Sequence, residues 1–268
     1  MTQVLHGRRL RGIVQTIVQS GATSWLSVSP DTSVSARTAV SDPTIDVWLA
    51  DLDALQAWAA PYANWLDATE RQRADRLRHE SLHARYITSR VLLRGVLGAE
   101  MGIDPRDISF AVTAHGKPQI DAGQAALSCN WSHSRNLLLL GIARETSIGV
   151  DVEAPRVIER AARLGERVFS VAENLALHQA AALSKAQRDT AFATIWTRKE
   201  ALLKMYGHGF SVPARDFHVG ADPQSDIQLD DARVKSLPLP CRGHAALAWQ
   251  GSADKVIRCF LLGHAPQV

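Results

Sequence analysis

The chain has 268 residues and a mass of 29.2 kDa, with 46% hydrophobic and 21% charged residues. This composition excludes a disordered or fibrous chain over most of the length, and the length predicts one large domain or two ordinary ones. A formal net charge of +3 is too small to indicate nucleic-acid binding, although it suits an acidic partner. Three cysteines without a CxxC pair indicate neither a disulfide scaffold nor a zinc site, so we expect a cytoplasmic protein. We expect no signal peptide and no membrane span.

The first 43 residues differ from the rest of the chain. They include a long stretch that is rich in Ser, Thr and Ala and poor in large apolar residues, so residues 1–43 are interpreted as a poorly ordered extension. A strand is predicted over Ile45–Leu49. One long helix is predicted over Ala68–Gly98, with Gly102 just beyond it, an apolar face on one side and an arginine-rich face that is by default solvated.

The rest of the chain alternates between strand and helix patterns. Short apolar segments predict four strands: Ile108–Val112, Leu127–Trp131, Leu137–Ala143 and Ser147–Glu153. Helical periodicity follows in two segments: Val157–Ala182, with a break near Phe169, and Asp189–Tyr206, closed by Gly207. Several short strands are predicted over Phe217–Leu262. This order indicates an α+β protein with two lobes of similar size.

Two carboxylates stand two residues apart in an apolar strand. Because residues i and i+2 of a strand point to the same face, Asp151 and Glu153 would lie side by side and repel each other unless a cation lies between them. Oxygen-rich sites of this kind suit Mg²⁺, which also takes phosphate oxygens. The alternative is an ordinary strand end whose polar face meets water.

A second group of charges lies on the last predicted helix. Glu200 and Lys204 share a helix face, and Lys199 lies next to them in the sequence. A carboxylate beside two lysines could ligate a metal while the lysines neutralise phosphate. The alternative is a common intrahelical ion pair. A third group, Ser132 and His133, follows a predicted strand and could donate hydrogen bonds to phosphate, although a single loop histidine is often only structural or exposed.

A competing motif, His-Glu-x-x-His, occupies residues 79–83. On a helix, His79 and His83 would share a face and Glu80 could serve as a general base, as in zinc proteases. The surrounding segment is strongly basic, which disfavours a dication, and a five-residue pattern with two free positions often arises by chance. We interpret this motif as a coincidence.

In chain order, the segments that carry chemistry form one pattern. Its residues are Arg85-Tyr86, Arg90–Arg94, Gly116-Lys117-Pro118, Asn130–Ser134, Gly149–Glu153, Phe169-Ser170 with Glu173, and Trp196-x-x-Lys199-Glu200-Ala201-x-x-Lys204. The pattern resembles the 4′-phosphopantetheinyl transferases of the larger, two-lobed type that activates surfactin synthetase. The resemblance covers roughly residues 44–262, and the first 43 residues match nothing in the family pattern.

The resemblance implies a fold and a reaction. The fold would be two similar α/β lobes related by a pseudo-twofold axis, with the active site in the cleft between them. Residues 44–145 would bind the nucleotide end of coenzyme A, and residues 146–268 would carry Mg²⁺ and the catalytic residues. The enzyme, a monomer, would transfer 4′-phosphopantetheine from coenzyme A to a serine of an apo acyl or peptidyl carrier protein, an acidic helical bundle, and release 3′,5′-ADP. No Walker A sequence is present, which argues against a P-loop kinase.

The resemblance also assigns roles to single residues. Asp151, Glu153 and Glu200 would hold Mg²⁺, with Mn²⁺ as an alternative ion, and Glu200 is also the candidate base for the serine proton. The phosphate oxygens would be neutralised by Lys199, Lys204 and His133. Coenzyme A contacts would further include Arg85 near the 3′-phosphate, Arg73, His115, Gly116, Lys117, Pro118, Ser132 and Asp151. The segment Phe169–Phe192 would either dock the carrier protein or simply pack the second lobe. A non-catalytic module that binds coenzyme A is the remaining alternative.

Overall fold

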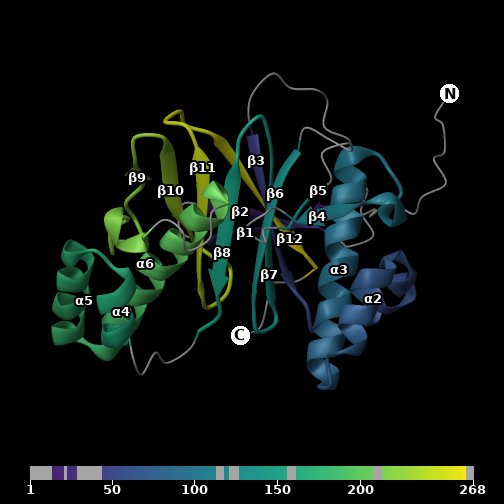
Figure 1. Cartoon of the computed structure of the whole chain (residues 1–268), viewed down its shortest axis with the longest axis horizontal. Coiled ribbons are helices and arrows are strands. Elements are labelled where there is room, and N and C mark those ends of the chain that lie inside the picture. The colour runs from purple at the N-terminus through teal and green to yellow at the C-terminus, as the bar shows by residue number, and fades with distance from the viewer. Residues whose placement is uncertain are drawn as a thin grey trace.

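Two β-sheets lie next to each other in the middle of the molecule, with helices packed against them (Figure 1). The computed structural model describes residues 14–20, 23–28, 44–112, 118–120, 127–155, 161–207 and 213–263. Within these residues, no helix combines the length and the apolar character that a membrane crossing requires. The combination of helices and mostly antiparallel strands confirms the mixed α and β class expected from the sequence.

The larger sheet has six described strands in the order β1-β2-β12-β3-β7-β6. Strand β12 pairs in parallel with β2 and with β3, and the other pairs are antiparallel. Seven consecutive residues of β7 are buried because its side chains alternate between two apolar clusters, one on each face of the sheet. The strands are β1 (Val14–Ser20), β2 (Thr23–Val28), β3 (Thr44–Asp51), β6 (Leu127–Ser134), β7 (Leu137–Arg144) and β12 (Val256–Leu262).

The second sheet has four described strands, all antiparallel, in the order β8-β11-β10-β9. One apolar cluster joins the two sheets, since it contains Ile45 and Leu139 of the first sheet together with Val150 and Leu247 of the second. The strands are β8 (Ile148–Glu153), β9 (Ile227–Gln228), β10 (Ala232–Leu237) and β11 (His244–Gln250), and a separate hairpin is formed by β4 (Phe110–Val112) and β5 (Pro118–Ile120).

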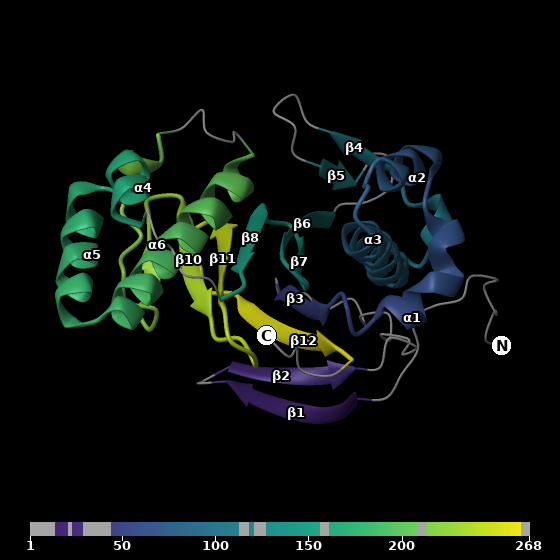
Figure 2. The same cartoon turned by 90° about the horizontal axis from the view of Figure 1, so that it is seen from below.

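The helices of the first half pack on one side of the molecule (Figure 2). They are α1 (Gln56–Ala59), α2 (Ala68–Asp75) and α3 (Glu80–Met101). The predicted single helix over Ala68–Gly98 is therefore wrong in one respect, because residues 76–79 separate α2 from α3. Helix α3 also runs past Gly98 and ends at Gly102, whose positive φ of 71° suits a glycine C-cap.

The arginine-rich face of this region is only partly solvated, which corrects the sequence-based expectation. Arg94 is completely buried in α3 and donates to Glu70, Asp67 and the backbone oxygens of Pro105 and Ile108. These partners explain how the charge is buried, because each of the three guanidinium nitrogens donates to at least one acceptor. Periodicity alone could not reveal this network, since its members come from separate segments.

The helices of the second half cover the four-stranded sheet from the other side (Figures 1 and 2). They are α4 (Ala161–Val168), α5 (Val171–Leu183) and α6 (Lys185–Tyr206). A capping box between Ser170 and Glu173 starts α5, which confirms the predicted break near Phe169. Helix α6 ends at Gly207 with φ of 72°, as predicted. Short 3₁₀ helices cover Ala60–Trp65, Pro105–Asp107 and Ala214–Asp216.

The two ends of the chain are arranged differently from the division into an extension and two lobes that the sequence predicts. Strands β1 and β2 lie within residues 1–43, where a poorly ordered extension is expected, and Trp25 of β2 is fully buried. Strand β12 from the end of the chain lies between β2 and β3, so the larger sheet combines both halves of the sequence. These pairings are long-range, and the local composition of residues 1–43 carries no sign of them.

Candidate active site

The edge strand β6 of the larger sheet faces the edge strand β8 of the smaller one, and side chains bridge them. Asn130 accepts a hydrogen bond from the backbone N–H of Val150 at 2.8 Å, and the Ser128 hydroxyl accepts one from the N–H of Ile148 at 3.2 Å. Because alternate residues of a strand share a face, every second residue of β6 points toward β8. Polar residues occupy every second position of β6, and this spacing is a sequence pattern that could have predicted the contact with β8.

The same alternation brings two serines to the two strand carboxylates. The Ser132 hydroxyl donates to Oδ1 of Asp151 at 2.8 Å, and the Ser134 hydroxyl donates to Oε2 of Glu153 at 3.0 Å. Asp151 is buried, with 6% of its surface exposed. The structure therefore brings Ser132, Asp151 and Glu153 together at the junction of the two sheets.

Lys204 of helix α6 completes this junction. Its ammonium lies 2.7 Å from Oδ1 of Asp151 and donates to the Ser132 hydroxyl at 3.0 Å. The lysine keeps 27% of its side chain exposed, so it is not sealed into the core. Three elements that are distant in sequence thus meet in one hydrogen-bonded group of Ser132, Asp151 and Lys204, which is named the β6–β8–α6 junction below.

Gly149 allows α6 to lie close enough to β8 for this contact. A Cβ atom at Gly149 would overlap the backbone oxygen of Ala201 and the backbone nitrogen of Met205, both in α6. Gly149 belongs to one of the sequence motifs, but no local pattern predicts a role for it. The structure shows that it fixes the helix-to-strand distance that places Lys204 beside Asp151.

A Gly149→Ala substitution is expected to lower the melting temperature and to abolish function together. The added methyl group must displace α6 backbone, and overpacking of this kind costs roughly 1–3 kcal/mol or more. Displacement of α6 separates Lys204 from Asp151. Thermal unfolding and an activity assay on the same preparation would check this, and a variant that keeps both properties would show that α6 does not depend on this close approach.

Glu200 lies in the electrostatic field of the same junction. Burial raises the pKa of its carboxyl, and the negative charges of Asp151 and Glu153 raise the pKa further. The ammonium of Lys204 opposes this shift. Glu200 is therefore close enough to Asp151 and Glu153 for their charges to act on it, although the three residues come from a strand and a helix that are far apart in sequence.

The chemistry of these residues fits a divalent cation. In the described part of the chain, no three acidic, histidine or cysteine side chains are grouped closely enough to hold a metal ion as they stand. Oδ2 of Asp151 is nevertheless buried without a hydrogen-bond partner among the described residues, and the charges of Asp151 and Glu153 both act on the Glu200 carboxyl. An all-carboxylate oxygen set with one unsatisfied buried oxygen suits Mg²⁺.

A pocket of about 530 Å³ lies on the side of the junction where α2 and α3 pack. The outward-facing residues of β6, Trp131 and His133, line it, because they alternate with the serines that face β8. Desolvation lowers the pKa of His133, and three cations lower it further: Lys204, Arg73 and Arg90. The pocket is further lined by Asp67, Glu70, Arg73, Arg85, Tyr86, Arg90, Phe110 and Arg135, among others.

Two arginines of this pocket are already paired with carboxylates. Arg85 donates to both oxygens of Asp53 at 2.7 and 2.6 Å, and this contact raises the pKa of Arg85 above its usual value. Arg90 donates to Glu70 at 2.6 Å and lies over the Phe110 ring, 4.4 Å from its centroid. A guanidinium held on one edge still offers the N–H groups of its other edge to a ligand.

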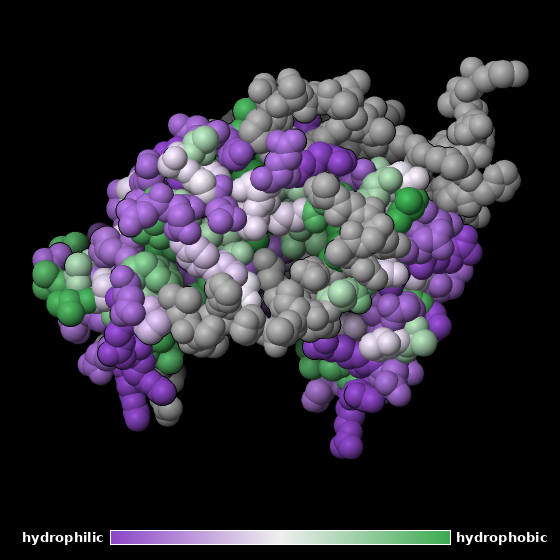
Figure 3. All heavy atoms as spheres, turned by 45° about the horizontal axis from the view of Figure 1, so that its top comes forward, coloured by the Kyte–Doolittle hydropathy of each residue, from purple (hydrophilic) through white to green (hydrophobic). Residues whose placement is uncertain are grey.

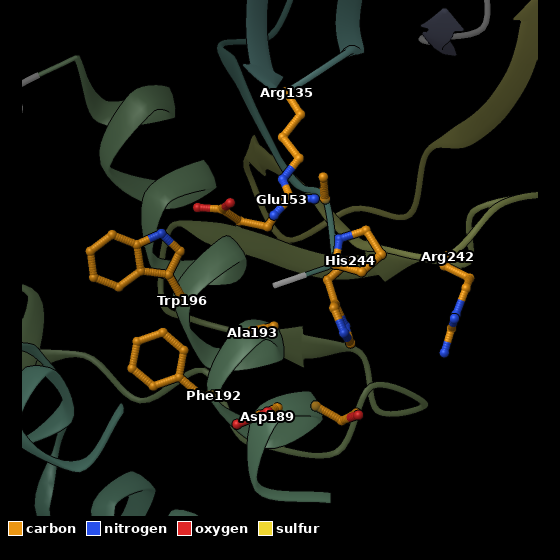
Figure 4. A pocket seen from close by; sticks show the side chains of 11 residues that line it. Arg135, Glu153, Asp189, Phe192, Ala193, Trp196, Arg242 and His244 are labelled. Atoms are coloured by element: carbon orange, nitrogen blue, oxygen red, sulfur yellow. The ribbon is translucent and has the colours of Figure 1, made fainter. Parts of the chain in front are cut away.

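A second pocket, of about 470 Å³, lies on the other side of Glu153. Trp196, Phe192 and Ala193 of α6 form an apolar wall, and the side chains of Arg135 and His244 approach from the opposite side (Figure 4). Arg135 lines both pockets, so the two hollows lie on either side of one residue. Sequence reasoning identified neither this pocket nor Arg135, since its lining comes from four separate segments.

Lys199 does not lie in the site, which corrects its predicted role on a phosphate. Its ammonium pairs with Glu173 at 2.8 Å and donates to the backbone oxygens of Ala214 and Phe217 at 2.6 and 2.7 Å. Lys199 is 1% exposed, and all three ammonium hydrogens are used within the fold. Glu173 is 0% exposed and also accepts from the N–H groups of Ser170 and Val219. The lysine and the glutamate of the family pattern form a structural ion pair.

Other predicted residues fall outside the site or outside the described chain. Residues 115–117, which include His115, Gly116 and Lys117, lie outside the described residues, and Pro118 is the first residue of β5. His79 precedes α3 with an extended backbone, ψ of 122°, so it does not share a helix face with His83 and the zinc-protease reading has no support. The segment Phe169–Phe192 contains both buried and exposed apolar residues, so part of it packs in the core and part of it lies on the surface.

The chain is similar in sequence to several known transferases. The sequence model of the 4′-phosphopantetheinyl transferase superfamily matches residues 147–255. The transferase HetI of Nostoc sp. is 29% identical over 216 residues, which cover 80% of this chain and 87% of HetI. In Bacillus subtilis, Sfp is 29% identical over 174 residues (64% of this chain, 74% of Sfp) and ffp is 30% identical over 168 residues (62% and 71%). The chain therefore belongs to the family of 4′-phosphopantetheinyl transferases.

Proposed function

We propose that this enzyme transfers the 4′-phosphopantetheine group from coenzyme A to a serine of an apo acyl or peptidyl carrier protein and releases 3′,5′-ADP. The observation that carries the proposal is the β6–β8–α6 junction, where Ser132, Asp151 and Lys204 meet in the field of Glu200. The family membership supports transfer of phosphopantetheine to carrier proteins. Dependence on Mg²⁺, the monomeric state and a cytoplasmic location are further parts of the proposal.

The nucleotide end of coenzyme A is assigned to the pocket between β6 and α3. Arg85 would bind the 3′-phosphate with the edge of its guanidinium that Asp53 leaves available, and Arg73 would assist it. Residues 115–118 are assigned to the adenine. The pantetheine arm would then enter the second pocket, whose wall of Phe192 and Trp196 suits an uncharged chain.

The diphosphate of coenzyme A would lie at the β6–β8–α6 junction, with one pocket on each side. Lys204 and His133 would donate to its oxygens, which carry the charge that increases as the bond to phosphorus breaks, and the Ser132 hydroxyl would join them by turning from Asp151 to the ligand. When bound by Asp151, Glu153 and Glu200, a divalent ion would neutralise the same oxygens. Glu200 is the candidate acceptor for the proton of the attacking serine, because its raised pKa makes it a better base than an ordinary carboxylate.

The acceptor protein is assigned to the outer surface of α4 and α5. Val171, Leu175 and Leu183 are exposed there, while Phe169 and Leu177 of the same segment are buried in the core. Figure 3 shows hydrophobic side chains gathered at the end of the molecule that α5 occupies in Figure 1. Exposed arginines of α4 lie nearby in the chain, at positions 163 and 167, and would suit an acidic helical bundle.

Mass spectrometry of apo carrier proteins tests the reaction directly. The enzyme is incubated with coenzyme A, Mg²⁺ and apo carriers from fatty acid, polyketide and peptide synthesis. A mass gain equal to one phosphopantetheine, absent from a carrier whose acceptor serine is replaced by alanine, is the expected result. A chain that binds coenzyme A but modifies no carrier under any of these conditions would indicate a non-catalytic binding module.

An Arg85→Ala variant is expected to weaken coenzyme A binding about tenfold or more while leaving dephospho-coenzyme A binding almost unchanged, because only coenzyme A carries the 3′-phosphate. The loss of an exposed ion pair with Asp53 should cost no more than about 1 kcal/mol of stability. Isothermal titration of both ligands would measure the ratio of affinities.

Arg106→Ala is the matched control for this variant. Arg106, which is itself exposed, also donates to both oxygens of one aspartate, Asp104, at 3.0 and 2.7 Å, but it lines neither pocket. The control should bind both ligands like the unmodified enzyme. Equal weakening of coenzyme A and dephospho-coenzyme A by Arg85→Ala would remove Arg85 from the 3′-phosphate.

A further inference from the structure

The turn between β6 and β7 places an arginine where backbone geometry favours glycine. Arg135 has a φ of 55°, in the left-handed region, and Glu145 is the other described non-glycine residue with a positive φ. The strand that leads to Arg135 is held in place by the contacts of Ser132 and Ser134 with the β8 carboxylates. The position of the turn relative to the junction is therefore well determined.

Arg135 is shared by the two pockets. It lines the nucleotide-side pocket together with Arg85 and His133, and it lines the second pocket together with Glu153 and Trp196. Figure 4 shows the side chain extended from the turn toward Glu153. A ligand that extended from one pocket to the other along Arg135 would contact this guanidinium.

The charge of Arg135 is not neutralised within the described structure. Arg85 and Arg90 of the same pocket are paired with Asp53 and Glu70, whereas Arg135 forms no hydrogen bond or ion pair with another described residue. Arg135 is also exposed, so its guanidinium keeps its donors available. Such a group binds an anion more readily than one that must first leave a carboxylate.

We propose that Arg135 binds the diphosphate that joins the nucleotide to the pantetheine arm of the co-substrate. This inference rests on the proposed function, because it needs one ligand with its nucleotide in the first pocket and its arm in the second. The segment between these two ends is a diphosphate, and a guanidinium binds two phosphate oxygens at once. Arg135 is thus a binding residue beyond those that the sequence pattern indicates.

The test compares two variants of Arg135 by direct titration of ligands. Arg135→Gly removes the side chain and accepts the positive φ, so the variant should fold at least as well as the unmodified enzyme. Its affinity for coenzyme A should fall about ten- to hundredfold, the range for a hydrogen-bonded charged contact, and its affinity for dephospho-coenzyme A should fall by the same factor. Arg135→Lys keeps the positive charge but lacks the planar guanidinium, so its affinity for coenzyme A should fall by a smaller factor.

Two controls separate this effect from others. Glu145→Gly relaxes the other positive-φ position, in the turn between β7 and β8, and should leave all ligand affinities unchanged. Adenosine 3′-phosphate lacks the diphosphate, so Arg135→Gly should not weaken its binding, whereas Arg85→Ala should. Binding of these ligands is measured without carrier protein, so the result does not depend on transfer.

Three outcomes would overturn the inference. Unchanged affinity for coenzyme A in Arg135→Gly would show that the guanidinium is merely solvated. A raised KM for the carrier with unchanged affinity for coenzyme A would assign Arg135 to the acceptor protein. A weakened affinity for adenosine 3′-phosphate would place it at the nucleoside end. If the unmodified enzyme binds coenzyme A but labels no carrier, the proposed function fails while these binding comparisons still decide the role of Arg135.

Discussion

An Asp151→Asn variant is expected to lose transfer activity by roughly hundred- to thousandfold or more, the cost of removing one preorganised charge from an active site. The substitution preserves the shape of the side chain while it removes the charge that Lys204 contacts at 2.7 Å. It also removes one of the three carboxylates assigned to the divalent ion. The rate of carrier modification at saturating coenzyme A and Mg²⁺ measures the loss.

The matched control for this variant is Asp226→Asn. Asp226 also pairs with a lysine, Lys235, at 3.1 Å, but this pair is exposed on the four-stranded sheet and lines neither pocket. The control should retain full activity. Both variants should melt close to the unmodified enzyme, so that a loss of activity is not a loss of fold. An Asp151→Asn enzyme that keeps Mg²⁺-dependent transfer would contradict the role assigned to Asp151.

A Lys199→Met variant is expected to lose about 3–5 kcal/mol of stability, because it leaves the buried charge of Glu173 without its partner. Burial lowers the pKa of Lys199, and the hydrogen bond and the charge of Glu173 offset this shift only in part. The remaining backbone donors to Glu173, from Ser170 and Val219, do not supply a compensating charge. Chemical denaturation with a two-state fit would measure the change.

Lys235→Met provides the comparison, since its partner Asp226 is exposed. Breaking that surface pair should change stability by no more than about 1 kcal/mol. A Lys199→Met/Glu173→Gln double variant should recover part of the loss, because it removes the unpaired charge. If Lys199→Met were as stable as the unmodified protein but bound coenzyme A poorly, the earlier assignment of Lys199 to a phosphate would regain support.

Most of the secondary structure was predictable because local patterns determine it. The unbroken apolar run of β7, the alternation in β8 and the glycine that ends α6 at Gly207 all appear in the sequence and in the structure. The break between α2 and α3 was not predicted. Its residues, 76–79, lack a proline or glycine, and the break became apparent only from the extended backbone of His79 before α3.

The candidate site was predictable in its carboxylates and less so in its cations. Asp151 and Glu153 had to share a face because a strand has a period of two, and Glu200 and Lys204 had to share one because a helix has a period of 3.6. Lys199 lies next to Glu200 in the sequence, yet neighbouring helical residues point about 100° apart. That rotation turns Lys199 toward Glu173, and only the packing of α5 beside α6 supplies the buried acid.

The sequence by itself determined most of the strands and helices after residue 43, which acidic residues lie on a common face, and which family the motifs resemble, since these depend on residues a few positions apart. Only the tertiary structure decided the pairing of β12 with β2 and β3, the contact of Lys204 with Asp151, and the position of Arg135 in the lining of both pockets. The physical reason is that these features join segments separated by many residues. Their formation depends on burial and close approach, such as that at Gly149, which no local pattern encodes.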